Sequence, residues 1–148
     1  MCFMLFVATD KALPLKEWRE DAPGIWVGPL RENEAAVRGH FNKPVVQYVG
    51  STSGCGCDFP HWILFNGEVP TDGFDGRDEG LRKVNYENAK NLVKLLRDSS
   101  ETSVEIYSVW AGNESNPPLS KKSITIEGIL MPTFLFGEQV FYQVRILS

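Results

Sequence analysis

The chain has 148 residues, of which 43% are hydrophobic and 23% charged, and its 15 basic and 19 acidic residues give a formal net charge of −4. This profile is typical of one globular domain spanning residues 1–148, and it excludes collagen-like and disordered chains. The acidic balance, without a cluster of lysines and arginines, argues against nonspecific binding to nucleic acid or to an anionic membrane. A chain of this length can bury enough surface to fold without disulfides or a structural metal.

Residues 2–8 have the length and the aromatic content of a strand that is buried on both faces. A short strand is predicted at 24–28. Asn33 then precedes an acidic turn, which predicts a two-turn helix over 34–40 with Asn33 as its N-cap. The next strand is predicted at 44–50, and it runs directly into a loop rich in serine, glycine and cysteine.

Residues 67–80 hold several glycines and acidic residues and predict a long acidic loop. Apolar residues recur with the helical period at about 84–98, and basic residues occupy the opposite side, so a long amphipathic helix is predicted there. Alternation of polar and apolar residues predicts further strands at 104–110, 123–130 and 139–147. The alternation in the last two strands favours an antiparallel sheet with one solvated face.

These patterns together predict a single α+β domain. Its sheet is mainly antiparallel with about five or six strands, and one long helix (about 84–98) and one short helix pack on it. No apolar run approaches the roughly 18 to 20 residues that cross a bilayer, and the start of the chain lacks the basic region and cleavage site of a secretory signal. Three cysteines, an odd number, do not make the disulfide framework of a secreted domain. We therefore expect a cytoplasmic protein.

The most unusual feature of the sequence is a set of metal-ligating residues. Cys55 and Cys57 place two thiols two residues apart in a glycine-rich loop, where the backbone can aim both at one point. His61 follows four residues later, and Cys2 joins them if its strand pairs antiparallel with the strand that precedes the loop. Thiolates are soft ligands, and tetrahedral zinc needs four donors at about 2.0 to 2.3 Å. The sequence thus predicts a site for zinc or a small ligand, formed by residues 51–61 and Cys2.

Cys2 also supports an enzymatic hypothesis. If Met1 is removed, Cys2 becomes the N-terminus, and its α-amine can act as general base for its own thiol. This start resembles that of the N-terminal-nucleophile amidohydrolases and amidotransferases. The resemblance implies a cysteine-dependent, amidohydrolase-like enzyme in which Cys2 is the catalytic nucleophile.

Other interpretations of the same residues stay open. The serines and glycines of the loop are suited to a backbone nest for an anion or a carboxylate, with Cys55 or Cys57 as nucleophile and His61 or His40 as base. The simplest alternative is that the cysteines are buried as small apolar residues and that His61 is a hydrogen-bonded edge residue.

A third class of function is a non-enzymatic protein-interaction module. The chain has four tryptophans, a generous number for its length. Aromatic side chains on loops can anchor a protein partner because each offers a large, rigid apolar surface. The tryptophans in question are Trp18, Trp26, Trp62 and Trp110.

Overall fold

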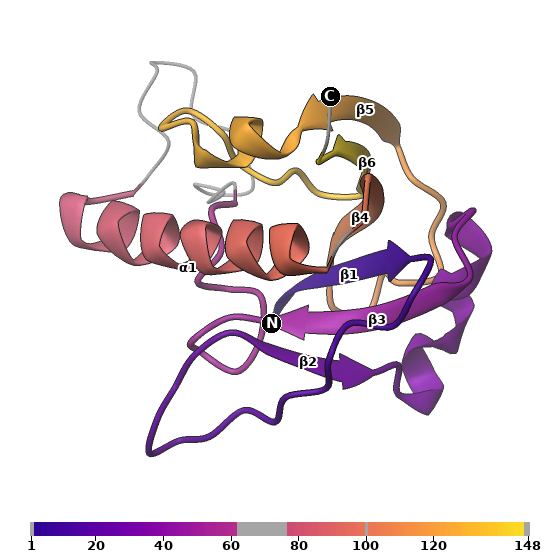
Figure 1. Ribbon diagram of the computed structural model, residues 1–148, viewed down its shortest axis with the longest axis horizontal. Helices are drawn as coiled ribbons and strands as arrows, with labels where there is room; N and C mark the ends of the chain where they lie inside the picture. Colours follow the sequence, from indigo (N-terminus) through magenta and orange to yellow (C-terminus); the bar gives the residue numbers. More distant parts are fainter. Residues whose placement is uncertain (1, 62–76, 100, 147–148) are drawn as a thin grey trace.

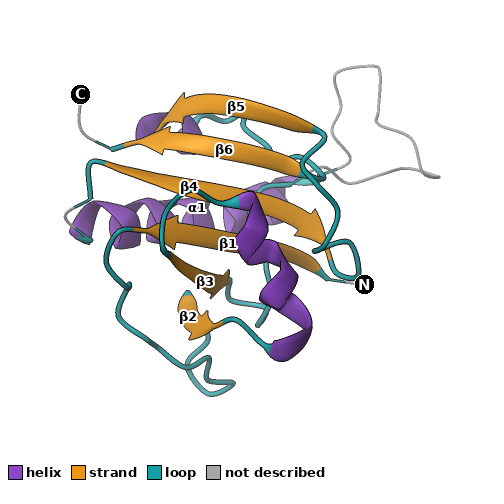
Figure 2. Ribbon diagram, turned by 90° about the vertical axis from the view of Figure 1, so that its right-hand side faces the viewer, coloured by secondary structure: helices purple, strands orange, loops and turns teal. Residues whose placement is uncertain are grey.

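The computed structural model describes residues 2–61, 77–99 and 101–146. The strands are β1 (Phe3–Thr9), β2 (Trp26–Pro29), β3 (Val45–Gly50), β4 (Ser103–Trp110), β5 (Ser120–Thr125) and β6 (Val140–Arg145). The helices are α1 (Glu79–Asp98) and two 3₁₀ helices, η1 (Glu32–His40) and η2 (Ile126–Leu130). In this part of the chain the six strands form one sheet in the order β2-β3-β1-β4-β6-β5, with α1 on one face and η1 on the other (Figures 1 and 2). The predicted α+β class is confirmed.

Strand β1 lies in the interior of the sheet, between β3 and β4, and its side chains pack into a core on each face of the sheet. Every residue of β1 is buried. Leu5 and Val7 point into the core on the α1 side, whereas Met4 and Phe6 point into the core on the η1 side. β1 pairs antiparallel with β3 along one edge and with β4 along the other. The start of β1 therefore lies beside the end of β3, which is the condition on which Cys2 was expected to join the other thiols.

Helix α1 packs on the sheet through Leu92, Leu96 and neighbouring apolar residues. It begins at Glu79, earlier than the predicted start near residue 84. The added turn is stabilised by the Asp78 carboxylate, which accepts the backbone N–H of Leu81 at 2.7 Å. Such a cap satisfies backbone donors without any apolar residue, so hydrophobic periodicity does not reveal it.

Helix η1 covers the opposite face and differs from its prediction in two respects. It begins at Glu32, so Asn33 is inside the helix and is not its N-cap. The backbone N–H of Arg31 instead donates to the Glu34 carboxylate at 2.8 Å. The helix is 3₁₀, and its buried residues, Glu34 and Val37, are three positions apart, which matches the three-residue turn of that helix.

The predicted strand at 123–130 is wrong beyond Thr125. Residues 126–130 form η2, in which Ile126 and Ile129 are buried. The apolar residues that favoured a strand are thus spaced for one face of a 3₁₀ turn. β5 pairs parallel with β6, whereas the other neighbouring strands pair antiparallel, so the sheet is mixed and mainly antiparallel. The long connection through η2 returns the chain to the end at which β5 began, as a parallel pair requires.

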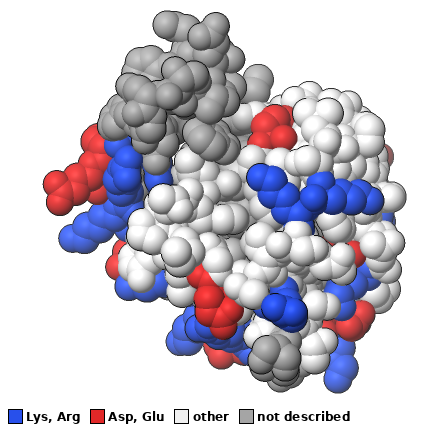
Figure 3. All heavy atoms as spheres, turned by 90° about the horizontal axis from the view of Figure 1, so that it is seen from above, with Lys and Arg blue, Asp and Glu red and all other residues white. Residues whose placement is uncertain are grey.

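The remaining expectations concern the acidic loop, Trp62, membrane-spanning segments and surface charge. The predicted acidic loop at 67–80 and Trp62 fall largely or wholly outside the described residues. Among the helices of the described residues, none has the length and apolar character to cross a membrane. On the face shown in Figure 3, acidic and basic side chains are scattered among uncharged residues. That face therefore carries charges of both signs.

Candidate metal centre

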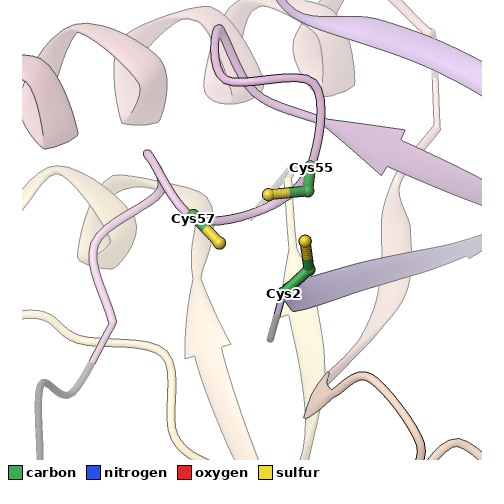
Figure 4. Close-up of side chains that lie close together, drawn as sticks. All are labelled: Cys2, Cys55 and Cys57. Carbon is green, nitrogen blue, oxygen red and sulfur yellow. The ribbon is translucent and has the colours of Figure 1, made fainter.

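The three thiols of the chain meet at one end of the sheet. Cys2 directly precedes β1, and Cys55 and Cys57 belong to the loop that follows β3 (Figure 4). Their sulfur atoms all lie within 4.8 Å of one another. Cys2 is exposed, the other two are partly buried, and all three are free thiols. In the described part of the chain, no other group of three or more His, Cys, Asp or Glu donors comes as close together.

Backbone contacts with β1 bring the loop to this position. Gly56 donates its N–H to the carbonyl oxygen of Phe3 at 2.8 Å, and Phe3 donates its own N–H to the sulfur of Cys57 at 3.3 Å. A Cβ atom on residue 56 would lie 2.6 Å from that carbonyl oxygen. The glycine between the two cysteines therefore permits the close approach that places both thiols beside Cys2.

The loop itself closes in a tight turn between Ser51 and Cys55. The backbone N–H of Ser51 donates to the carbonyl oxygen of Cys55 at 2.6 Å, and the Ser51 hydroxyl donates to the same oxygen. Gly54 adopts a left-handed conformation with φ of 86°, which an L side chain would strain. Trp18 lies over Gly54 and donates its indole N–H to the carbonyl oxygen of Thr52 at 3.1 Å. These contacts fix the conformation from which Cys55 projects.

Two buried asparagines of α1 hold the loop from the other side. The Asn88 amide accepts the backbone N–H of Thr52 at 3.0 Å and donates to the Thr52 hydroxyl at 3.1 Å. The Asn85 amide donates to the carbonyl oxygen of Asp58 at 2.8 Å. The Thr52 hydroxyl in turn donates to the Asp58 carboxylate. Sequence analysis missed both asparagines, although two amides three positions apart on the inward face of a helix are a usable signal.

The three thiols do not titrate alike. Burial, followed by a hydrogen bond with Cys55, raises the pKa of Cys57 to about 12. A hydrogen bond with Cys55, followed by burial, raises the pKa of Cys2 above its ordinary value. Burial also acts to raise the pKa of Cys55, but hydrogen bonds from the Cys57 thiol, the Cys57 backbone and Ser53 outweigh it, and this pKa lies below its ordinary value. Cys55 is thus the sulfur that loses its proton first, with the two other thiols as donors.

His61 lies next to this cluster but outside the set of mutually close donor atoms. Its Nε2 is 3.1 Å from the carbonyl oxygen of Cys57. Its ring stacks on Phe3, with centroids 4.5 Å apart and an interplanar angle of 18°, and it meets Trp110 edge-on at 5.6 Å. The structure therefore brings together three of the four predicted ligands, the cysteines. It places the His61 imidazole beside the backbone of Cys57. Coordination by His61 stays a prediction.

The second histidine and the tryptophans lie in other settings. The Nε2 of His40 is 2.9 Å from the carbonyl oxygen of Glu114, at the end of η1. Trp26 packs against Tyr48 with centroids 5.0 Å apart, and Trp110 packs against Phe3. Trp18 contacts the loop of residues 51–61, here called the thiol loop. Each of the three described tryptophans thus contacts the sheet or the thiol loop. A role as anchors for a protein partner stays a prediction.

Comparison with known proteins gives no independent indication of what this site binds. No protein-family model, curated protein or solved structure matches the chain. The chemistry of the cluster therefore rests on its own geometry. Bonds of about 2.3 Å from a tetrahedral zinc ion place its sulfur ligands about 3.8 Å apart. Since the three sulfurs already lie within 4.8 Å of one another, each pair has to approach by about 1 Å at most to hold one ion.

Proposed function

We propose that this protein binds a zinc ion through the thiolates of Cys2, Cys55 and Cys57, with His61 as the fourth donor. The observation that carries the proposal is the convergence of three sulfurs from two separate segments, the start of β1 and the loop after β3. Cysteines that serve only as small apolar residues are expected singly inside a core. Here the sulfurs face one another and one of them is exposed.

The protonation of the cluster supports a cation as its ligand. Burial and a hydrogen bond to Cys55 raise the pKa of Cys57, and a hydrogen bond to Cys55 raises the pKa of Cys2, so both thiols stay protonated beside Cys55. A metal ion binds cysteine as thiolate, so it replaces these shared protons and neutralises the negative charge that the thiolates would otherwise concentrate. Structural zinc sites are almost always tetrahedral with four cysteine or histidine ligands. Three thiolates and one imidazole make such a set.

His61 is the fourth donor that the local geometry offers. It follows Cys57 by four residues, and its Nε2 already lies 3.1 Å from the Cys57 carbonyl oxygen. Because His61 lies outside the group of mutually close donor atoms, coordination requires its imidazole to move closer to the sulfurs. A site closed by four protein ligands is of the structural kind, so zinc would tie the start of β1 to the loop after β3.

The enzymatic alternative has weaker support. A nucleophilic cysteine reacts as the thiolate and is expected to have a lowered pKa. The pKa of Cys2 is raised, chiefly because Cys55 accepts its hydrogen bond. With Met1 in place, the Cys2 thiol thus lacks the lowered pKa of an activated nucleophile.

Zinc titration tests the proposal. Reduced, metal-free protein is titrated with zinc chloride in competition with a chromogenic chelator, and we expect one zinc ion per chain. Serine at any of the three cysteine positions is expected to weaken binding at least about a hundredfold, more than the loss of an outer-shell partner. His61→Gln is expected to weaken binding, whereas the matched control His40→Gln is expected to leave it unchanged. Circular dichroism shows that each variant is folded.

Two results would contradict the proposal. One is the absence of stoichiometric zinc binding to the reduced wild-type chain. The other is an affinity that Cys2→Ser, Cys55→Ser and Cys57→Ser all leave unchanged, because the bound zinc would then lie elsewhere. Equal binding by His61→Gln and His40→Gln would contradict the role of His61 as the fourth donor.

A further inference from the structure

The same three sulfurs are close enough to react with one another. We propose that a hydroperoxide inactivates the metal site by joining Cys2 to Cys55 in a disulfide, which removes two of the three thiolate ligands and releases the ion. This inference rests on the proposed zinc binding for its consequence, the release of zinc. The disulfide itself is a property of the metal-free chain.

The geometry allows the bond between these two residues. A disulfide has a sulfur–sulfur length of about 2.05 Å. The sulfurs of Cys2 and Cys55 lie within 4.8 Å of each other, so they have to approach by about 2.8 Å at most to form the bond. In Figure 4 the Cys2 sulfur points from the start of β1 toward the loop that carries Cys55.

Cys57 is the less favourable partner for either of the other thiols. Its sulfur accepts the Phe3 N–H at 3.3 Å, which holds it against β1. A disulfide between Cys55 and Cys57 would enclose Gly56 alone, and Gly56 is fixed by its own bond to the Phe3 carbonyl oxygen at 2.8 Å. Such a short ring strains the disulfide and makes it more reducible. A bond between Cys2 and Cys55 instead links two distant segments and restricts the unfolded chain.

Exposure sets the order of the two steps. Cys2 is the exposed thiol, so the oxidant reaches it first. The Cys2 thiol first gives up its proton to the solvent, and its sulfur then attacks one oxygen of hydrogen peroxide, which breaks the O–O bond and gives a sulfenic acid and hydroxide. The Cys55 thiolate then attacks the sulfur of Cys2 and expels a second hydroxide. Two thiolates lose two electrons, the peroxide gains them, and two protons from the solvent convert both hydroxides to water.

Peptide mapping of the metal-free protein tests the disulfide. Reduced protein is treated with one equivalent of hydrogen peroxide, alkylated and analysed by intact mass and peptide mapping. We expect loss of the mass of two hydrogen atoms and a peptide that joins Cys2 to Cys55. Cys57→Ser, the matched control, is expected to form the same bond, whereas Cys2→Ser and Cys55→Ser are expected to give at least about tenfold less intramolecular disulfide. The wild-type map alone decides the question if a variant does not fold.

The zinc-loaded protein tests the consequence. Peroxide is expected to release zinc to a chromogenic chelator in step with disulfide formation, and dithiothreitol is expected to restore binding. A map that shows Cys55 joined to Cys57, or only sulfinic and sulfonic acids, overturns the inference while zinc binding stands. Formation of the disulfide in a chain that binds no zinc overturns the proposed function and, with it, the release step. These two failures are therefore distinguishable.

Discussion

Substitution of Gly56 by alanine tests the contact on which the thiol cluster depends. A Cβ at this position would lie 2.6 Å from the Phe3 carbonyl oxygen, 3.2 Å from its carbon and 3.4 Å from the Leu5 nitrogen. All three atoms belong to the backbone of a central strand, so they cannot move aside as the end of a side chain would. The loop is therefore expected to move away from β1.

The expected magnitude follows from two effects. Forcing a methyl group into a closely packed contact costs about 1 to 3 kcal/mol. Loss of the hydrogen bond from the Gly56 N–H to the Phe3 carbonyl oxygen, 2.8 Å long here, costs about 1 kcal/mol. We therefore expect Gly56→Ala to lower the free energy of unfolding of the metal-free protein by about 2 to 4 kcal/mol. Zinc affinity is expected to fall as well, because Cys55 and Cys57 move with the loop.

Urea denaturation of the reduced, metal-free protein measures the first effect and chelator competition measures the second. Gly39→Ala is the matched control, because a Cβ at Gly39 meets no atom within 4 Å and the residue lies in η1, away from the thiols. Its free energy of unfolding is expected to stay the same or to rise by up to about 1 kcal/mol. If Gly56→Ala instead unfolds like the wild type and binds zinc equally well, the close approach of the loop to β1 is wrong.

Two further predictions concern the support of the loop and the titration of the core. Asn88→Ala removes the amide that binds the backbone and the hydroxyl of Thr52, and it is expected to lower the free energy of unfolding by about 1 to 3 kcal/mol in urea denaturation; an unchanged midpoint would contradict this role. Burial, with the charge of Glu138, raises the pKa of the Tyr107 phenol from 10.0 to about 12, so above pH 10 the unfolded state loses a proton that the folded state keeps. Thermal denaturation is therefore expected to show stability falling from pH 10 to pH 12, and falling less steeply in Tyr107→Phe; identical slopes for the two proteins would refute the assignment.

Local patterns in the sequence were sufficient for much of the fold. The apolar run at the start of the chain predicts a strand that is buried on both faces. Successive side chains of a strand point to opposite faces of the sheet, so an uninterrupted apolar run is expected where both faces are covered, as they are at β1. The helical period of Leu92 and its neighbours identifies the face of α1 that packs on the sheet. The antiparallel pairing of β1 with β3 was an assumption at that point, and its presence in the structure explains why Cys2 lies beside the loop with Cys55 and Cys57.

Other features depend on contacts between distant residues, which a local pattern does not contain. The apolar residues Ile126 and Ile129 fit a strand or a 3₁₀ turn equally well, and only their packing against the core selects the turn. The parallel pairing of β5 with β6 depends on the path of the connection between them. Asn85 and Asn88 acquire their role only when α1 lies against the thiol loop, where their amides satisfy its backbone. The sequence by itself thus determined which residues are candidate ligands, whereas the tertiary structure decided that the three sulfurs meet, because their separation is set by strand pairing and by the contacts of the loop with β1.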